Sequence, residues 1–316
     1  MINNKKIAIV IPCYKVERHI ASVIAAIPQV VDFIITVDDC SPDNTYNVIK
    51  ALNNSKVILV QNSKNLGVGG AVVYGYQLAI DLGVEIIVKI DGDDQMDLSL
   101  LNNFIEPLLL GNADYAKGNR FYWPDSLQGM PFMRLLGNSG LSFINKLSSG
   151  YWDIMDPTNG YTAINAFTAR NLGLVKVEKR YFFESDMLFR LGLIRARVID
   201  IPMRPKYGDE QSNLSVLNSL FSFPSKYVKR FLKRIIYLYF LRDFNAGSVF
   251  LSLGLPMLLL GFLAGCLKWY EALVTNSQTP TGTLFLIALF LIFGTQFILS
   301  FLIFDVQNTP KNNLIK

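Results

Sequence analysis

Residues 84–96, Val-Glu-Ile-Ile-Val-Lys-Ile-Asp-Gly-Asp-Asp-Gln-Met, decide the fold class of this chain. Residues 86–90 form a short β-branched run, which predicts a strand, and a polar turn follows it directly. In an open α/β sheet, ligands bind at the carboxyl ends of the strands. Asp91 and Asp93 can therefore both reach one hard cation, Mg²⁺ or Mn²⁺, and Gln95 can add a neutral oxygen. The motif alone would be read as an acidic surface turn, but its place after a strand favours a metal site.

Similar runs on both sides of this stretch predict alternating strands and helices. The expected strands are residues 6–11, 33–37, 57–60, 86–90, 115–117 and 197–201. The expected helices are residues 16–27, 44–52, 69–82, 98–110, 132–147 and 184–194. This alternation predicts an α/β fold with a Rossmann-like, doubly wound and mostly parallel sheet. The rest of residues 118–165 is loop-like and is the expected acceptor side.

Two other predicted strands also end in side chains suited to a nucleotide. After the first strand, Tyr14 offers a ring for a base and Glu17 offers a carboxylate. After the second, Asp38 and Asp39 can accept hydrogen bonds from a base or a ribose hydroxyl. The glycine-rich stretch around Gly67 opens a helix and suits nucleotide binding or tight packing equally well. It lacks the lysine and spacing of a P-loop.

The C-terminal third predicts a membrane anchor. Residues 247–267 and 283–304 contain no charged side chain and are each long enough to cross a bilayer. A basic, amphipathic stretch at 217–242 precedes them and predicts a helix in the bilayer interface, with a helix packed on the domain as the alternative. By the positive-inside rule, both flanks are expected in the cytoplasm and loop 268–282 outside. The expected boundaries are 1–215 for the catalytic domain, 216–244 for the juxtamembrane segment, 245–306 for the hairpin and 307–316 for a cytoplasmic tail.

Composition narrows the chemistry. The chain has 316 residues, one histidine and three cysteines, and its mean hydropathy of +0.31 is high for a soluble enzyme. A single histidine excludes histidine-dependent triads and histidine-rich metal sites, so carboxylates are expected to do the chemistry. The start of the sequence lacks signal-peptide features, which predicts a cytoplasmic catalytic domain at the inner membrane. The net charge of +5 is concentrated before the hairpin, which favours a membrane surface over nucleic acid as a partner.

The motifs together carry a family resemblance. The series IPCYKVE, VDDCSPDNT, NLGVGGA and IDGDDQ, in this order and spacing, resembles the inverting GT-A glycosyltransferases of family 2. It is most similar to the polyisoprenyl-phosphate glycosyltransferases related to dolichol-phosphate mannose synthase. The later segments AKGNR, DPTNGYTA, FESDM and PMRPKYGDEQSNLS fall where that family has its later motifs. A two-helix C-terminal hairpin is common among its bacterial members.

The resemblance assigns roles to individual residues. It implies nucleotide binding by Pro12, Tyr14, Glu17, Asp38, Asp39 and, at the metal turn, Asp91. It implies metal binding by Asp91, Asp93 and Gln95. It also places Arg120 and Arg134 at positions that contact donor or acceptor phosphate, a task suited to the guanidinium fork.

Three carboxylates are candidates for catalysis. Asp156 is expected to orient acceptor, sugar or metal, and Asp186 is the better base if the acceptor is a hydroxyl, with Glu184 beside it. A lipid phosphate is already ionised and needs no base.

The chain departs from the family by having Lys15 where asparagine is common.

A second departure concerns the lipid-phosphate contact. Residues 208–213 replace a Gly-x-Ser-Lys run of the family, and Arg204 and Lys206 are the expected substitutes for the missing lysine.

The sequence therefore predicts transfer of a sugar from a nucleoside diphosphate sugar to a polyprenyl phosphate. UDP is the expected nucleotide, on the general frequency of UDP-sugars as donors. The first alternative is transfer to a hydroxyl of a lipid-linked saccharide in cell-surface polysaccharide synthesis. A more distant alternative is a non-catalytic nucleotide-sugar-binding membrane subunit. The expected partners are the donor, the lipid acceptor and the bilayer, with homo-oligomer formation left open.

Overall fold

The computed structural model describes residues 5–127, 132–204 and 216–314. Its contacts divide the chain into two compact units. The N-terminal unit comprises Met1–Leu232 and Pro310–Lys316, and the helical unit comprises Lys233–Thr309. The chain thus leaves the N-terminal unit once and returns to it near its end.

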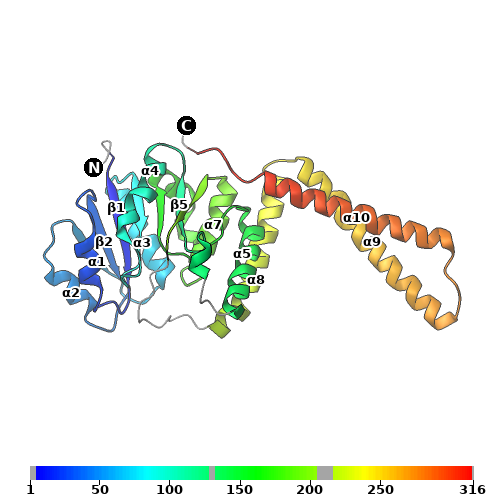
Figure 1. Ribbon diagram of the computed structural model, residues 1–316, viewed down its shortest axis with the longest axis horizontal. Helices are drawn as coiled ribbons and strands as arrows, with labels where there is room; N and C mark the ends of the chain where they lie inside the picture. The colour runs from blue at the N-terminus through cyan, green and yellow to red at the C-terminus, as the bar shows by residue number, and fades with distance from the viewer. Residues whose placement is uncertain (1–4, 128–131, 205–215, 315–316) are drawn as a thin grey trace. The chain divides into compact units, whose positions relative to one another are not determined.

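A seven-stranded mixed sheet forms the centre of the N-terminal unit (Figure 1). Its strands are β1 (Ile7–Cys13), β2 (Phe33–Asp38), β3 (Val57–Gln61), β4 (Ile86–Lys89), β5 (Tyr115–Asn119), β6 (Thr162–Asn165) and β7 (Val198–Pro202). Their order across the sheet is β3-β2-β1-β4-β6-β5-β7. Only β6 runs antiparallel to its neighbours β4 and β5. The strand order reverses next to β1, so the carboxyl ends of β1 and β4 flank a ligand-binding crevice of the kind that parallel α/β sheets form.

Helices cover both faces of the sheet (Figure 1). On one face, the core comes from α3 (Val68–Asp81), α6 (Ala166–Asn171) and α7 (Phe183–Ile194). On the other face, it comes from α1 (Ile20–Ala26), α2 (Thr45–Ala51) and α4 (Leu101–Leu109). Strand β1 supplies both cores because successive side chains alternate: Ala8 and Val10 point to the first, and Ile7 and Ile9 to the second. The unit also contains α5 (Phe132–Ser149) and three short helices, η1 (Leu98–Leu100), η2 (Pro124–Leu127) and η3 (Leu174–Lys176).

The predicted α/β class, the six predicted strands and the predicted helices are all confirmed. The structure adds β6 and α6, which the sequence analysis missed. Strand β6 has only four residues and follows a stretch rich in Gly, Asn and Pro, so its period-2 pattern is too short to recognise. Strand β6 lies between β4 and β5 and runs antiparallel to both. The loop that precedes β6 therefore lies at the carboxyl ends of β4 and β5, where the site is expected.

Helix α8 (Val216–Ile236) begins in the N-terminal unit and packs on it. Lys226 and Arg230 pair with Glu178 at 3.0 and 3.2 Å, and the Tyr227 hydroxyl lies 2.6 Å from Ser185 Oγ. Part of the basic cluster therefore faces protein, as the alternative of a packed helix predicted.

The helical unit contains two long apolar helices, α9 (Ala246–Thr275) and α10 (Thr281–Gln307). Their most apolar windows have mean hydropathies of 2.2 and 2.5, and only 11% of each window is buried. Both helices are long and apolar enough to cross a membrane. Helix α9 runs eight residues beyond the predicted end at 267, so the connecting loop is shorter than the expected 268–282.

Close packing joins the two helices of this hairpin. A Cβ at Gly294 would lie 2.7 Å from the Leu258 backbone nitrogen, so glycine is required for this approach. Near the end of α10, Asp305 is buried and receives two bonds from Arg234, at 2.7 and 3.0 Å. The Tyr239 hydroxyl, in the π-helical turn η4 (Tyr237–Leu241), donates to the same carboxylate at 2.5 Å. This fully hydrogen-bonded cluster ties the start of the helical unit to its end.

Candidate active site

The loops after β1 and β2 are joined to each other by backbone donors. Lys15 N–H donates to Ser41 Oγ at 2.7 Å, and Glu17 Oε2 accepts from Asn44 N–H at 2.8 Å. Lys15 has a φ of 59°, a conformation that favours asparagine or glycine. Pro12 lies within β1 and the Tyr14 ring is 41% exposed, so the ring can stack on a base. Glu17 supports the turn through Asn44 in addition to any ligand contact.

Asp38 and Asp39 differ in what they hold. Asp38 is buried and accepts from Gln61 Nε2 at 2.7 Å, and burial raises the pKa of its carboxyl. Asp39 accepts from the backbone N–H groups of Leu66 and Gly67, at 2.8 and 2.7 Å. Both oxygens of Asp39 are thus bonded to the loop that opens α3. Asp39 therefore anchors this loop, and its expected role in nucleotide binding stays a prediction.

The glycine-rich start of α3 packs against the chain segment before α7. Gly67 has a φ of 84°, and a Cβ there would lie 2.6 Å from the Lys179 carbonyl oxygen. Gly70 N–H donates to the same carbonyl at 3.0 Å. Packing against protein backbone therefore explains why glycine stands at position 67, and nucleotide binding by Gly67 stays a prediction.

The acidic turn after β4 lies where the sequence placed it. Asp91 Oδ1 accepts from Lys89 Nζ at 2.6 Å, and Asp93 Oδ1 accepts from the Gln95 backbone N–H at 3.1 Å. Gly160 lies against both side chains, and a Cβ there would overlap Asp91 Oδ2 and Lys89 Nζ. The loop before β6 therefore packs directly against this turn.

The donor set of this turn fits a hard divalent cation. Carboxylate oxygens are the ligands that Mg²⁺ and Mn²⁺ prefer, and such ions usually retain water or substrate oxygens as further ligands. Within the residues that the structure describes, no group of three or more His, Cys, Asp or Glu side chains has metal-binding geometry. Asp91 and Asp93 could supply carboxylate oxygens to such an ion, and the Gln95 side chain could supply a neutral oxygen.

Two buried lysines lie beneath the turn, and the sequence analysis did not identify either. Lys89 Nζ is 3.9 Å from Glu184 Oε1, and Lys117 Nζ donates to the Asn159 carbonyl at 2.5 Å. Burial alone would lower the pKa of Lys89, but the charges of Asp91 and Glu184 outweigh it and raise that pKa. Burial lowers the pKa of Lys117 to about 8 and raises the pKa of Glu184. Lysines within apolar strands were the signal that could have found them, since lysine is rarely buried without a partner.

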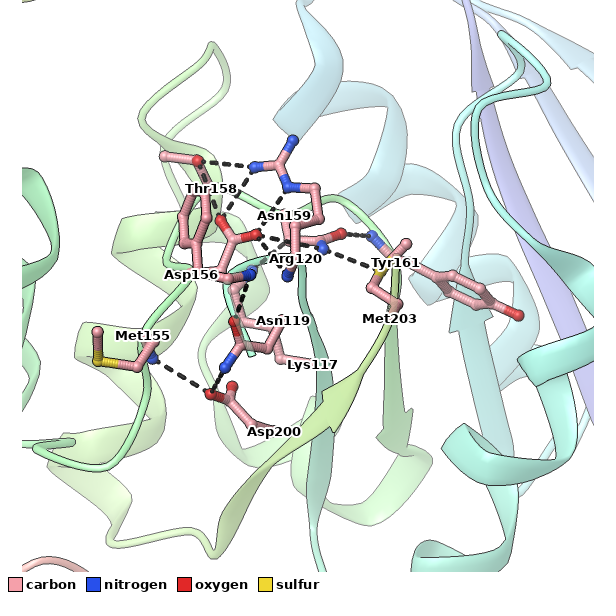
Figure 2. Close-up of polar contacts among 11 residues, drawn as sticks. Lys117, Asn119, Arg120, Met155, Asp156, Thr158, Asn159, Tyr161, Asp200 and Met203 are labelled. Atoms are coloured by element: carbon pink, nitrogen blue, oxygen red, sulfur yellow. Dashed lines mark hydrogen bonds and ion pairs between the residues drawn. The ribbon is translucent and has the colours of Figure 1, made fainter. Parts of the chain in front are cut away.

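Arg120 and Asp156 form a two-point ion pair beside this cluster (Figure 2). Arg120 Nε and Nη2 donate to the two oxygens of Asp156 at 2.7 and 3.0 Å. Asp156 is fully buried, whereas the Arg120 side chain is 37% exposed. Burial would raise the pKa of Asp156, but the hydrogen bonds and charge of Arg120 hold it below its ordinary value. Asp156 therefore fixes the guanidinium of Arg120 at the edge of the site.

Asp186 is buried among hydrogen-bond donors from α7, from α8 and from the segment before α7. Its oxygens accept from Arg190 Nε at 2.9 Å, Arg230 Nε at 2.5 Å and Glu178 N–H at 3.0 Å. The carboxylate of Asp186 is fully buried and accepts these three hydrogen bonds. It therefore connects α7 to α8. This geometry gives Asp186 a structural role, and its expected role as a general base stays a prediction.

The remaining candidates are described only in part. Arg204 is exposed at the end of β7. Arg134 lies in α5, but its side chain is outside the described residues, and Lys206 lies outside them altogether.

The fold and the site together define a GT-A-like glycosyltransferase domain followed by two long apolar helices. The model of glycosyl transferase family 2 matches residues 8–173, and the chain belongs to that family.

Comparison with characterised relatives agrees with this assignment. Over 219 residues the chain is 31% identical to the UDP-N-acetylglucosamine–dolichyl-phosphate N-acetylglucosaminyltransferase of Methanococcus voltae, covering 65% of this chain and 87% of that protein. Over 178 residues it is 27% identical to the undecaprenyl-phosphate mannosyltransferase of Micrococcus luteus, covering 54% of this chain and 70% of that protein.

A solved structure shares the fold. Glucosyl-3-phosphoglycerate synthase of Mycobacterium tuberculosis, crystallised with Mn²⁺, UDP and glucosyl-3-phosphoglycerate, superposes with a TM-score of 0.53. The two sequences are 20% identical, and the match covers 73% of this chain and 80% of that one. At this identity the likeness establishes the fold of the N-terminal unit.

Proposed function

We propose that this glycosyltransferase moves a sugar from a nucleoside diphosphate sugar to a polyprenyl phosphate at the cytoplasmic membrane face. The donor that we propose is a UDP-sugar. The observation that carries the proposal is the segment from Asp156 to Gly160. Asp156 holds Arg120, and Gly160 packs on Asp91 of the acidic turn. An anion-binding arginine and a turn suited to a diphosphate thus lie at the two ends of one five-residue segment. The lipid-phosphate acceptors in the names of both relatives agree with this choice.

In the proposed reaction, an oxygen of the lipid phosphate attacks the anomeric carbon of the sugar. The bond from that carbon to the diphosphate breaks, and the nucleoside diphosphate leaves with the electron pair. A divalent cation held by Asp91 and Asp93 would supply positive charge for the leaving diphosphate. Tyr14 and Asp38 are proposed to bind the nucleoside, and Arg120, Arg134 and Arg204 to bind phosphate.

The buried lysines maintain the charge balance of the site. Lys89 is buried and neutralises part of the charge of Asp91 and of Glu184, so the mostly buried Glu184 leaves no unpaired charge in the protein interior. Because an ionised phosphate needs no general base, the reaction does not require a free carboxylate beside the acceptor.

Glu184 supports one alternative, transfer to a saccharide hydroxyl. It borders the site, and burial raises the pKa of its carboxyl, as is common for catalytic bases. A glycosyl phosphate is labile to mild acid, whereas an ordinary glycoside is much less so, and this difference separates the two products.

We propose that α9 and α10 anchor the enzyme beside its lipid substrate. Their exposed apolar surfaces match a bilayer, and confinement near the membrane raises the effective concentration of acceptor. The chain enters the helical unit from the N-terminal unit and returns to it afterwards. Two membrane spans agree with this connection, because an even number of spans leaves both flanks on the same side of the membrane.

The test uses the full chain in detergent with polyprenyl phosphate, Mg²⁺ or Mn²⁺ and a panel of nucleotide-sugars. We expect one acid-labile glycosyl lipid, identified by mass, and its loss in excess chelator. Asp93→Ala is expected to abolish both transfer and metal-dependent donor binding. Asp97→Asn is the matched control, because Asp97 lies in the same loop and only caps η1. Unchanged activity of Asp93→Ala, or full activity of the wild type in excess chelator, would refute the metal assignment.

A further inference from the structure

Asp200 on β7 connects the two chain segments that carry the Arg120–Asp156 pair (Figure 2). Its Oδ2 accepts from Asn119 Nδ2 at 2.7 Å and from the Met155 backbone N–H at 3.2 Å. Asn119 immediately precedes Arg120, and Met155 immediately precedes Asp156. One carboxylate oxygen therefore holds the residue before each partner of the ion pair.

Asn119 passes this constraint to the turn that bears Arg120. Its side chain is buried, and its Oδ1 accepts from the Phe121 backbone N–H at 2.9 Å. The amide of Asn119 thus bonds to Asp200 with one end and to the residue after Arg120 with the other. Arg120 is fixed on both sides along the chain as well as by Asp156.

The second oxygen of Asp200 has an unusual environment. Among the described residues, Asp200 Oδ1 is buried and has no hydrogen-bond partner. The charged groups that face the carboxyl are Lys117, its partner in the parallel β5–β7 register, and Asp156 from the neighbouring loop. A carboxylate that leaves an oxygen unpaired in a protein interior is costly, and burial raises the pKa of Asp200 to about 6. An apolar residue would avoid this cost, so the contacts made by Oδ2 are the reason for an acid here.

We infer that Asp200 is a positioning residue for transfer, which holds Arg120 and Asp156 in register through Asn119 and Met155. The inference rests on the proposed function, in which Arg120 binds phosphate. Asp200 itself touches no reacting atom. Its effect reaches the reaction through the direction of the Arg120 guanidinium, for which a small displacement removes bidentate contact with an anion.

The experiment measures kcat and KM for polyprenyl phosphate in the full-length enzyme with Asp200→Ala, Asp200→Asn, Arg120→Ala and the double variant Asp200→Ala/Arg120→Ala. Asp200→Ala is expected to lose at least tenfold in kcat/KM. Asp200→Asn is expected to recover most of that loss, because its amide oxygen can accept both bonds. The double variant should be no worse than Arg120→Ala alone, because Asp200 acts through that residue.

A control separates positioning from a general loss of structure. Asp153→Ala changes an exposed carboxylate in the same segment and is expected to keep wild-type kinetics. If Asp200→Ala does not fold, Asn119→Ala removes the link to Arg120 and is expected to show the same loss and the same non-additivity with Arg120→Ala.

Three results would overturn the inference. The first is wild-type transfer by Asp200→Ala, or by Asn119→Ala where that variant is needed, beside an impaired Arg120→Ala. The second is losses that multiply in the double variant, which would indicate a structural role unrelated to Arg120. Wild-type transfer by Arg120→Ala would instead refute the phosphate role of Arg120 in the proposed function, and the inference with it.

Discussion

Gly160 packs its backbone directly against the carboxylate of Asp91. A Cβ at this position would overlap Asp91 Oδ2 and Lys89 Nζ, both of which belong to the proposed metal turn. The loop before β6 and the turn after β4 are thus in contact at a point where only a hydrogen atom fits. Glycine at 160 is required by this approach, and its φ lies outside the left-handed range.

We expect Gly160→Ala to reduce metal-dependent transfer at least tenfold, because Asp91 must move out of its ligand position. Overpacking of this kind costs about 1–3 kcal/mol of folding free energy, so the variant should still fold. Steady-state transfer against metal concentration, together with a melting curve, measures both effects. Gly137→Ala is the matched control, since a Cβ on that exposed helical glycine meets nothing within 4 Å. Unchanged metal dependence in Gly160→Ala would show that Asp91 is not a ligand.

Asp186→Asn is expected to destabilise the enzyme without removing its chemistry. The substitution removes the carboxylate charge that pairs with Arg190 and Arg230, and breaking a buried pair costs about 3 kcal/mol. For a unit of this size that corresponds to a fall in Tm of roughly 6–12 °C. Differential scanning fluorimetry checks the shift, and Asp81→Asn, an exposed carboxylate on α3, is the control.

Activity of the same variant tests the acceptor. With a lipid phosphate, folded Asp186→Asn should retain most of its kcat below its melting temperature. A protein with wild-type Tm that is inactive across the pH range of a general base would favour the hydroxyl acceptor instead.

Asp200 predicts a pH dependence of stability with a defined sign. Its folded-state pKa of about 6 lies above the ordinary value of about 3.9, so between these values the folded state binds more protons. Its contribution to the free energy of unfolding therefore falls as pH rises from about 4 to 6 and then levels off. Asp200→Asn lacks this loss and should gain stability relative to wild type over the same interval. Urea titrations at pH 4.5, 6 and 7.5 would measure it, and a difference that is constant with pH would contradict the prediction.

The membrane arrangement can be tested with single cysteines. We expect Ser277→Cys, in the loop between α9 and α10, to react with an impermeant maleimide in intact cells. Cys40 is exposed in the N-terminal unit and should react only after permeabilisation. A Cys266→Ala background removes the remaining exposed thiol, since Cys13 is buried. Labelling of Ser277→Cys only in permeabilised cells would refute the proposed topology.

The C-terminal tail supports the same arrangement. The Leu314 backbone N–H donates to both oxygens of the buried Asp114, at 3.2 and 3.0 Å, and the Leu314 side chain packs on the core. The described residues 310–314 therefore belong to the N-terminal unit, whereas the sequence analysis described 307–316 only as a cytoplasmic tail. Backbone hydrogen bonds to a distant aspartate have no sequence pattern, which is why this docking was not foreseen.

The sequence by itself determined the α/β class, the two long apolar helices and the acidic turn at the end of β4. Each of these follows from local periodicity or from the place of a motif after a strand, which are properties of neighbouring residues. Only the tertiary structure decided that Asp39 and Gly67 take part in packing the loop before α3. It also placed Asp186 in an ion network and connected Asp200 to the residues before Arg120 and Asp156. These depend on which partners surround a side chain after folding, and those partners lie 4 to 112 residues away. A carboxylate that binds a ligand and one that binds an arginine look alike in sequence, because only the folded surroundings determine where its oxygens point.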